Sequence, residues 1–116
     1  MIGIDIENIE RFKNLSQHLI ERVYTKNEIE YCSSHANPHI HFAGMWCVKE
    51  AVVKALEDLN LAVSQIEILH KSTGAPYINI TSKLKQYFDE KNIKDIHISI
   101  SHTDTIATAV AMIEKQ

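Results

Sequence analysis

The chain has 116 residues, of which 45% are hydrophobic, so we expect residues 1–116 to form one domain that folds without disulfides. Its formal net charge of −3 argues against a general nucleic-acid-binding protein, which would have a basic footprint. The two cysteines, Cys32 and Cys47, have neither CxxC nor metal-ligand spacing, which predicts a reducing, cytoplasmic setting.

The hydrophobic segments are too short for a membrane-spanning helix. The longest apolar run near the end of the chain, Ile106–Ile113, falls far below the roughly 20 residues that such a helix needs. The chain also opens directly into a strand pattern, without a basic segment in front of it. We therefore expect no export signal and no membrane span.

The first 33 residues are predicted to form a strand and two helices. Residues Ile2–Ile9 read as a strand, and apolar residues at helical spacing predict a helix over Glu10–Val23. Thr25 and Glu28 have the spacing of a capping box, in which each side chain accepts a hydrogen bond from the other residue's backbone. This pattern predicts that a second helix covers Lys26–Ser33.

A long apolar helix is predicted in the middle of the chain. After a breaker segment at residues 34–37, Pro38 suits the first turn of a helix. The pattern then stays helical over His39–Leu59, with apolar residues on most of the circumference. We expect this helix to be buried on most sides.

The second half of the chain is predicted to contain four strands and one short helix. The expected strands are Ala62–His70, Tyr77–Ile80, Ile96–Ile100 and Ile106–Ile113, and the expected helix is Ser82–Lys91. The first two strands form a hairpin around a turn at residues 72–76. This order indicates an α+β fold, with an antiparallel sheet packed on a long buried helix, rather than a parallel doubly wound sheet.

Asp5 is the first candidate for a functional residue. It lies in the apolar strand pattern of residues 2–6. An ionised carboxylate in such a strand costs several kcal/mol unless a cation or hydrogen bonds compensate for it. That cost makes a functional role for Asp5 the better explanation of its presence.

Glu50 and Lys54 lie four residues apart, so they share one face of the predicted long helix. At this spacing a surface ion pair is the ordinary alternative, but the apolar neighbours favour a cleft or a partner surface. If the first strand packs on this helix, Asp5 and Glu50 meet. Two carboxylates suit Mg²⁺, and Lys54 would then neutralise or protonate a phosphate leaving oxygen.

Histidines and basic residues add weaker signals. His102 follows Ser99 and Ser101 at the end of a strand, where the two serines share one face and His102 lies on the other or in the turn. By itself such a histidine is structural or exposed. A separate alternative is a transition-metal site in His35-x-x-x-His39-x-His41, although Pro38 and a predicted loop favour an exposed segment instead.

The basic residues Arg11, Lys13 and Arg22 are interleaved with glutamates in the first quarter of the chain. They form either a patch for an acidic partner or an ordinary solvated surface. Charge alone does not separate these two interpretations.

Taken together, these residues match a family. The chain resembles the holo-acyl-carrier-protein synthases, the small single-domain branch of the 4′-phosphopantetheinyl transferase superfamily. The matching segments are Gly3–Ile6, Ile9–Phe12, Glu21–Thr25 with Glu28, Phe42–Gly44, Lys49–Leu56, Ile66–Ile68, Gly74–Tyr77, Ile98–His102 and Ala107–Val110. They occur in the family's order, and the strand aspartate together with the Lys-Glu-Ala-x-x-Lys helix is the specific part of the match.

The resemblance implies transfer of the phosphopantetheine arm of coenzyme A to a serine of an apo acyl carrier protein, with release of 3′,5′-ADP, as in fatty acid biosynthesis. By matching position, Asp5 and Glu50 would hold Mg²⁺, and Lys54 would contact the phosphates. His102, Ser101 and Pro76 would help to hold coenzyme A.

Two further expectations follow from the same resemblance. Carrier proteins of this type are acidic, so Arg11, Lys13 and Arg22 become a docking patch. The family's small members also assemble as trimers with the active site between subunits, so a homotrimer is expected.

Three positions depart from the family pattern. The glycine-rich turn after the long helix is replaced by Glu57-Asp58-Leu59-Asn60-Leu61, and two usual cations are replaced by Met45 and Ala75. Acids near the pyrophosphate would repel it, so these changes predict an altered grip on coenzyme A. Two hypotheses stay open: a working transferase, favoured by Asp5, Glu50, Lys54 and His102 together, or a non-catalytic member that binds a carrier protein or nucleotide without transfer.

Overall fold

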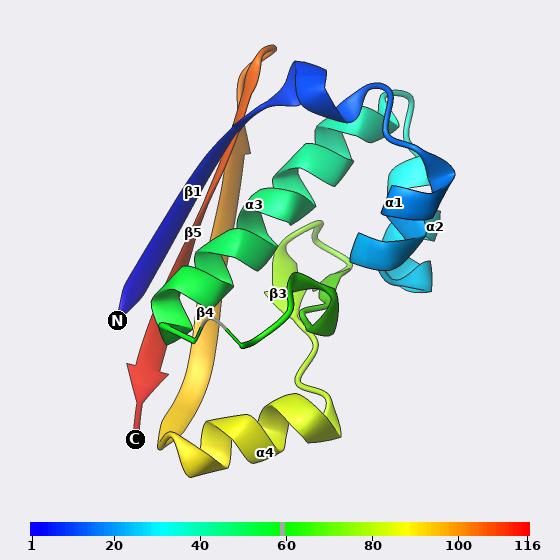
Figure 1. Ribbon diagram of the computed structural model, residues 1–116. Helices are drawn as coiled ribbons and strands as arrows, with labels where there is room; N and C mark the ends of the chain where they lie inside the picture. Colours follow the sequence, from blue (N-terminus) through cyan, green and yellow to red (C-terminus); the bar gives the residue numbers. More distant parts are fainter. Residues whose placement is uncertain (59) are drawn as a thin grey trace.

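An antiparallel sheet and one long helix form the centre of the molecule. The computed structural model describes residues 1–58 and 60–116. Strands β1 (Ile2–Asn8), β5 (Ile106–Lys115) and β4 (Ile93–His102) lie side by side in that order, all antiparallel. Helix α3 (Pro38–Leu56) packs across one face of this sheet (Figure 1). The predicted α+β class, with an antiparallel sheet on a long buried helix, is confirmed.

The remaining elements surround this centre. They are η1 (Ile9–Phe12), α1 (Gln17–Val23), α2 (Lys26–Ser33), η2 (Val63–Gln65), β2 (Ile68–His70), β3 (Pro76–Ile78) and α4 (Ser82–Glu90). Strands β2 and β3 form a separate hairpin, and β3 contacts β4. Helix α4 lies across one end of the sheet (Figure 1). Among residues 1–58 and 60–116, no helix has the length and apolar character needed to span a membrane.

Some predicted boundaries are wrong for local reasons. The helix predicted over Glu10–Val23 is two helices, η1 and α1, because the Ser16 side chain accepts a hydrogen bond from the backbone of Leu19 (3.1 Å) and starts a new helix. The strand predicted over Ala62–His70 is reduced to β2, and η2 occupies residues 63–65. The long helix ends at Leu56, while Leu59 lies outside the described residues.

Other predictions are confirmed. Helix α2 covers Lys26–Ser33, and both hydrogen bonds of its capping box, between Thr25 and Glu28, are present. Pro38 occupies the first turn of α3, where its missing N–H costs nothing. Strands β4 and β5 are longer than predicted, but they pair across the predicted turn.

Gly3 sets how closely β1 approaches α3. A β-carbon built on Gly3 would lie 2.0 Å from the backbone oxygen of Ala51 and 2.7 Å from the backbone nitrogen of Ala55. Only glycine allows this approach, which brings β1 against the helix. Because side chains alternate along a strand, Asp5 shares the helix-facing side with Gly3, whereas Ile4 faces outward and is 65% exposed.

A buried ion pair joins α2, α3 and β2. The ammonium of Lys49 lies 2.8 Å from Oε1 of Glu28, and both side chains are fully buried. Glu28 also accepts hydrogen bonds from the backbone of Thr25 and of Ile68, each at 2.8 Å. Lys49 donates to the carbonyl of Ile66. Every charge in this cluster therefore has several partners, as buried charges require.

Helix α3 ends at a strained residue. Glu57, the C-cap, has a φ of 56° and adopts the left-handed conformation. Glycine is favoured there because a β-carbon in this conformation costs about 1 kcal/mol or more. The glutamate therefore destabilises the helix end, and its side chain is exposed.

Replacing Glu57 with glycine should stabilise the protein. We expect Glu57→Gly to raise the free energy of unfolding by about 0.5–1 kcal/mol, measured by urea titration at a fixed protein concentration. Glu57→Ala is the matched control, because it removes the charge and keeps the β-carbon. If both variants gain equally, charge rather than backbone strain is the cause.

Candidate functional site

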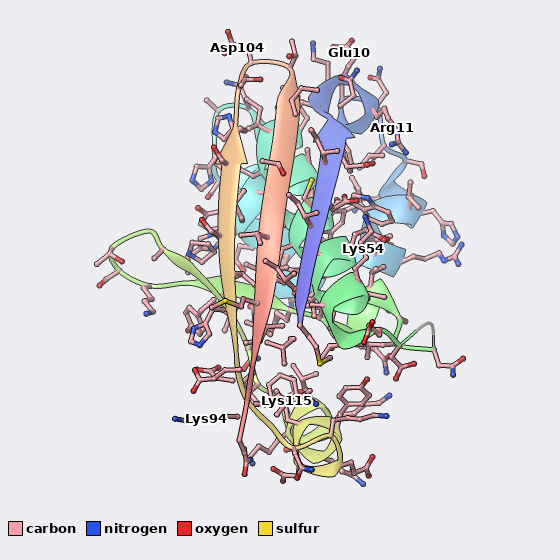
Figure 2. All side chains as sticks on the ribbon, turned by 90° about the vertical axis from the view of Figure 1, so that its left-hand side faces the viewer. Glu10, Arg11, Lys54, Lys94, Asp104 and Lys115 are labelled. Atoms are coloured by element: carbon pink, nitrogen blue, oxygen red, sulfur yellow. The ribbon has the colours of Figure 1, made fainter. Side chains whose placement is uncertain are left out.

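The predicted residues Asp5, Glu50 and Lys54 come together where β1 packs on α3. The Lys54 ammonium lies 3.0 Å from Asp5 Oδ1 and donates a second hydrogen bond of 3.0 Å to the carbonyl of Ile4. The Asp5 side chain is 13% exposed and that of Lys54 is 53% exposed. In Figure 2, Lys54 lies beside the β1 edge of the sheet. Lys54 thus pairs with Asp5 across the strand–helix contact, an ion pair that the sequence did not predict.

The second carboxylate of the site, that of Glu50, lies in an environment that disfavours its charged form. The pKa of Glu50 is raised, first by burial and then by the negative charge of Asp5, while Lys54 opposes the shift and Glu7 adds to it. Glu7 lies two residues beyond Asp5 on the same side of β1, and Arg11 pairs with it at 2.7 Å. The site therefore gathers negative charge that a cation would relieve.

Asp5 also has an oxygen without a partner. Its Oδ2 is buried and accepts no hydrogen bond from any described residue. A buried anionic oxygen left in this state costs free energy, whereas a cation beside it would remove the cost. Residues 1–58 and 60–116 contain no group of three or more His, Cys, Asp or Glu side chains placed to hold a metal. The donor set of Asp5 and Glu50 fits Mg²⁺, which takes few protein oxygens and fills its other positions with phosphate and water.

His102, Ser101 and Pro76 lie at the opposite edge of the sheet. In the register, Asp5 is opposite Ala109 of β5, which is opposite Ile100 of β4. His102 is therefore two strands, or about 10 Å, away from the β1 edge. It shares the helix-facing side with Ile100, and Ser101 points outward, as predicted.

Pro76 begins β3, which contacts β4 rather than β1. The structure therefore brings Asp5, Glu50 and Lys54 together and places His102, Ser101 and Pro76 elsewhere. Within one chain these two groups do not form one site.

The three predicted docking residues are on the surface. Arg11 pairs with Glu7, Lys13 pairs with Glu10 at 3.1 Å, and Arg22 is exposed on α1. Arg11 borders a groove of about 90 Å³, which is otherwise lined by apolar residues of η1, α1, the link between them and α3. Those residues include Phe12, Leu15, Leu19, Val23 and Trp46. The face combines positive charge with an apolar groove.

None of the described residues at the positions that depart from the family pattern is positively charged. Met45 is buried, with its sulfur 3.6 Å from that of Cys32. Ala75 is exposed in the hairpin turn, next to Gly74, whose φ of 92° requires glycine. Asp58 follows the strained Glu57 and accepts a hydrogen bond of 2.9 Å from the backbone of Asn60.

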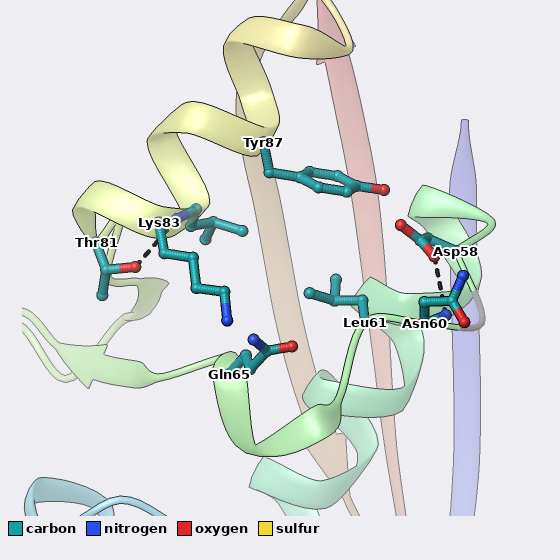
Figure 3. A pocket seen from close by; sticks show the side chains of 8 residues that line it. Asp58, Asn60, Leu61, Gln65, Thr81, Lys83 and Tyr87 are labelled. Atoms are coloured by element: carbon teal, nitrogen blue, oxygen red, sulfur yellow. Dashed lines mark hydrogen bonds between the residues drawn. The ribbon is translucent and has the colours of Figure 1, made fainter.

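A second cavity, of about 250 Å³, lies between α4 and the segment that follows α3 (Figure 3). Lys83 and Tyr87 of α4 and Leu61 and Gln65 of the facing segment line it. The Tyr87 hydroxyl is buried, and burial together with the neighbouring Asp58 carboxylate raises its pKa to about 12. None of the predicted site residues lines this cavity.

The segment with His35, His39 and His41 is neither an exposed loop nor a metal site in the part of the chain that the structure describes. His39 and His41 belong to α3 rather than to an exposed loop, and both are half-buried. The rings of His35 and His41 lie 4.1 Å apart, but no described residues form the proposed metal cluster. His70, from β2, joins them around Tyr31. The sequence held no signal for His70, because only the fold brings β2 beside α2.

Comparisons with known proteins show the family and agree with the fold. The family model of the 4′-phosphopantetheinyl transferase superfamily matches residues 1–111. The holo-[acyl-carrier-protein] synthase of Caldanaerobacter subterraneus subsp. tengcongensis is 37% identical over 116 residues, which cover 96% of this chain and 91% of that protein. A crystal structure of Helicobacter pylori holo-[acyl-carrier-protein] synthase in complex with coenzyme A has a TM-score of 0.83 and 30% identity, covering 98% of this chain and 100% of that one.

The chain also matches part of a much larger protein. It is 38% identical over 117 residues to fatty acid synthase subunit alpha of Candida albicans, with 97% of this chain covered. The chain spans 6% of the length of the fungal subunits that it matches. From the family model and the bacterial relatives together, this chain belongs to the 4′-phosphopantetheinyl transferase superfamily, in the branch of the holo-[acyl-carrier-protein] synthases.

Proposed function

We propose that this protein transfers the 4′-phosphopantetheine group of coenzyme A to a serine of an apo acyl carrier protein, in a Mg²⁺-dependent reaction that releases 3′,5′-ADP. The observation that supports it best is the arrangement of Asp5, Glu50 and Lys54. It combines an unpartnered carboxylate oxygen, a second carboxylate with a raised pKa and an ammonium 3.0 Å from the first. The names of the relatives, and the coenzyme A bound in the H. pylori structure, support the substrate assignment.

The proposed reaction is a phosphoryl transfer. The serine oxygen forms a bond to the phosphorus that bears the pantetheine arm, and the bond from that phosphorus to the bridging oxygen of the pyrophosphate breaks. The proton of the serine passes to a carboxylate or water, and 3′,5′-ADP leaves with the bridging oxygen. Such a step depends mainly on alignment and on neutralising phosphate charge.

Asp5 and Glu50 would hold Mg²⁺, which would neutralise the pyrophosphate and the charge on the leaving group. Lys54 is held by Asp5 and the carbonyl of Ile4, and more than half of its side chain is exposed. Its ammonium is therefore available to contact phosphate oxygens at the β1 edge.

We also propose that the active site is completed by a neighbouring chain in a homotrimer. Three isoleucines of β1 and one methionine of β5 form an apolar outer face on the sheet, which faces the viewer in Figure 2. Their exposed fractions are 69% for Ile2, 65% for Ile4, 65% for Ile6 and 52% for Met112. Apolar faces of this kind mark protein interfaces. A closed ring of identical contacts would bring the β4 edge of one chain, with His102, Ser101 and Pro76, to the β1 edge of the next.

Arg11, Lys13 and Arg22 would receive an acidic carrier protein. Positive charge at the rim of an interface mainly speeds encounter, and the adjacent groove would take an apolar side chain of the partner. Cys32 and Cys47 are buried and form no disulfide, which fits the cytoplasmic setting that we propose for this reaction.

Reversing one rim charge should weaken the use of the carrier protein alone. Arg22 is the better position to test, because Arg11 neutralises Glu7 beside Asp5. We expect Arg22→Glu to lower kcat/KM for the carrier protein by roughly three- to tenfold at low salt and to leave the KM for coenzyme A unchanged. Lys85→Glu on α4 is the control, and equal losses in both variants would contradict the docking assignment.

Mass spectrometry tests the proposed function directly. An apo acyl carrier protein incubated with this protein, coenzyme A and Mg²⁺ should gain one phosphopantetheine, about 340 Da, and EDTA should prevent the gain. Native mass spectrometry of the same sample should show three chains per particle. If several carrier proteins gain nothing while one binds to the folded protein, the chain is a binding member of the family that lacks transfer.

A further inference from the structure

Three histidines surround Tyr31, and a fourth, His102, lines a cavity beside it. The Tyr31 ring stacks on His70 at 3.7 Å between ring centroids, with 4° between the planes. His35 lies 4.5 Å from Tyr31 and 4.1 Å from His41. His41 and His70 also line a cavity of about 80 Å³ together with His102. This group of His35, His41, His70 and His102 is called the imidazole cluster below.

Two of these rings have a defined tautomer and a free nitrogen. Nδ1 of His35 lies 2.7 Å from the carbonyl oxygen of Tyr31, which can only accept, so Nδ1 holds the proton. For the same reason Nδ1 of His102 donates to the carbonyl of Thr103 at 3.1 Å. Each ring is therefore fixed in place, and no described residue forms a hydrogen bond with its Nε2.

Protonation of His41 and His70 is unfavourable when no anion is bound. Burial lowers the pKa of His41, and the charges of His35, His102 and His70 lower it further. Burial and His35 likewise lower the pKa of His70. The groups that face His41 are Tyr31 of α2 and the other three imidazoles, which come from the loop after α2, from β2 and from β4. An anion in the cavity would cancel the repulsion between these rings.

We propose that the imidazole cluster is a proton-controlled site for a phosphate group of the nucleotide ligand, filled by phosphate and protons together. The inference rests on the proposed function, since that supplies a phosphate-bearing ligand. The cavity has the room of two to three waters, which suits a phosphate group and not a whole nucleotide.

The direction of the pH dependence follows from linkage. Burial and neighbouring imidazoles lower the pKa values of His41 and His70 in the free protein, and phosphate binds their protonated rings more tightly, so these two pKa values are higher in the complex. Affinity is then complete below the lowered pKa values of the free rings and falls as pH rises through the pKa values of the complex. Each proton taken up gives about a tenfold loss of affinity per pH unit in that window.

Calorimetry with 3′,5′-ADP tests the proposal. Titrations in EDTA, between about pH 6 and pH 8.5 and in buffers of different ionisation enthalpy, measure protons taken up per ligand bound. We expect about one proton per ligand near neutral pH, and most of it should disappear in His41→Asn and in His70→Asn. His18→Asn, at an exposed histidine of α1, is the control and should behave as the parent.

The variants separate the cluster from the ligand's own chemistry. The 3′-phosphate also takes up a proton near pH 6, but that uptake would persist in all variants. Uptake that is unchanged in both cluster variants, with both shown to be folded by thermal melting, overturns the proposal. So does the absence of ADP binding at every pH.

A parallel transfer assay at about pH 8.5 keeps the two proposals apart. Transfer to the carrier protein without proton-linked ADP binding would overturn the imidazole cluster and leave the proposed function standing. Proton-linked binding that His41→Asn removes, without transfer to any carrier protein, would support the cluster and overturn the function.

Discussion

Asp5→Ala and Glu50→Ala should each lower the rate of phosphopantetheine transfer by about 100-fold or more at saturating Mg²⁺. Each change removes one of the two carboxylates proposed to hold the cation, and losing the cation's stabilisation of a phosphoryl transition state costs at least this much. The rate of holo-carrier-protein formation, followed by mass spectrometry, measures the effect. Asp89→Ala, an exposed acid on α4, is the control that should keep the parental rate.

The same variants should keep their stability, which separates catalysis from folding. The pair between Lys54 and Asp5 contributes little, because the ammonium of Lys54 is solvated, and the unpartnered Oδ2 of Asp5 opposes folding. We expect the free energy of unfolding of Asp5→Ala to stay within about 1 kcal/mol of the parent. If either carboxylate variant transfers at the parental rate, the metal-site assignment is wrong.

A mixing experiment extends this prediction to the proposed trimer. Asp5→Ala lacks the β1 side of the site, and His102→Ala lacks the β4 side. Co-refolded from equal amounts, the two inactive variants should regain about a quarter of the parental rate, because about a quarter of the contacts then join two intact sides. A mixture as inactive as its components would place both sides in one chain or remove His102 from the site.

The centre of the candidate site could be predicted because it violates a folding rule. A carboxylate in an apolar strand is unfavourable unless a cation compensates for it. Lys54 compensates one oxygen of Asp5, and the other oxygen is left for a bound cation. Gly3 permits the close approach of β1 to α3. The sequence alone does not show this role, because it depends on how close Ala51 and Ala55 lie in the fold. The local sequence pattern therefore identified Asp5 and Lys54 as candidates, and the structure shows that they are in contact.

Features made by distant contacts could not be predicted. The helix pattern over Glu10–Val23 continued through Ser16, whose capping hydrogen bond divides it in two. The imidazole cluster depends on His70, which reaches Tyr31 only because β2 packs beside α2. Periodicity describes one segment at a time, so it does not report which segments become neighbours.

Lys49→Met should destabilise the protein more than any other single change considered. It would leave the Glu28 carboxylate fully buried without its cation, which costs about 3–5 kcal/mol. Urea titration at a fixed protein concentration measures the loss, which is a large part of the 5–15 kcal/mol typical of a domain. Val53→Met, at a half-buried position on the same helix, is the control for a change to methionine.

The double variant shows whether the pair or the lysine itself matters. In Glu28→Gln with Lys49→Met, the neutral glutamine oxygen still accepts from the backbone of Thr25 or Ile68, and no charge is buried. We expect it to recover at least half of the stability lost in Lys49→Met. A double variant no more stable than Lys49→Met would show that the ammonium's bond to the Ile66 carbonyl is the essential contact. In either case Lys49 fixes α3 against α2 and β2, and this anchor holds the next residue, Glu50, toward β1 and Asp5.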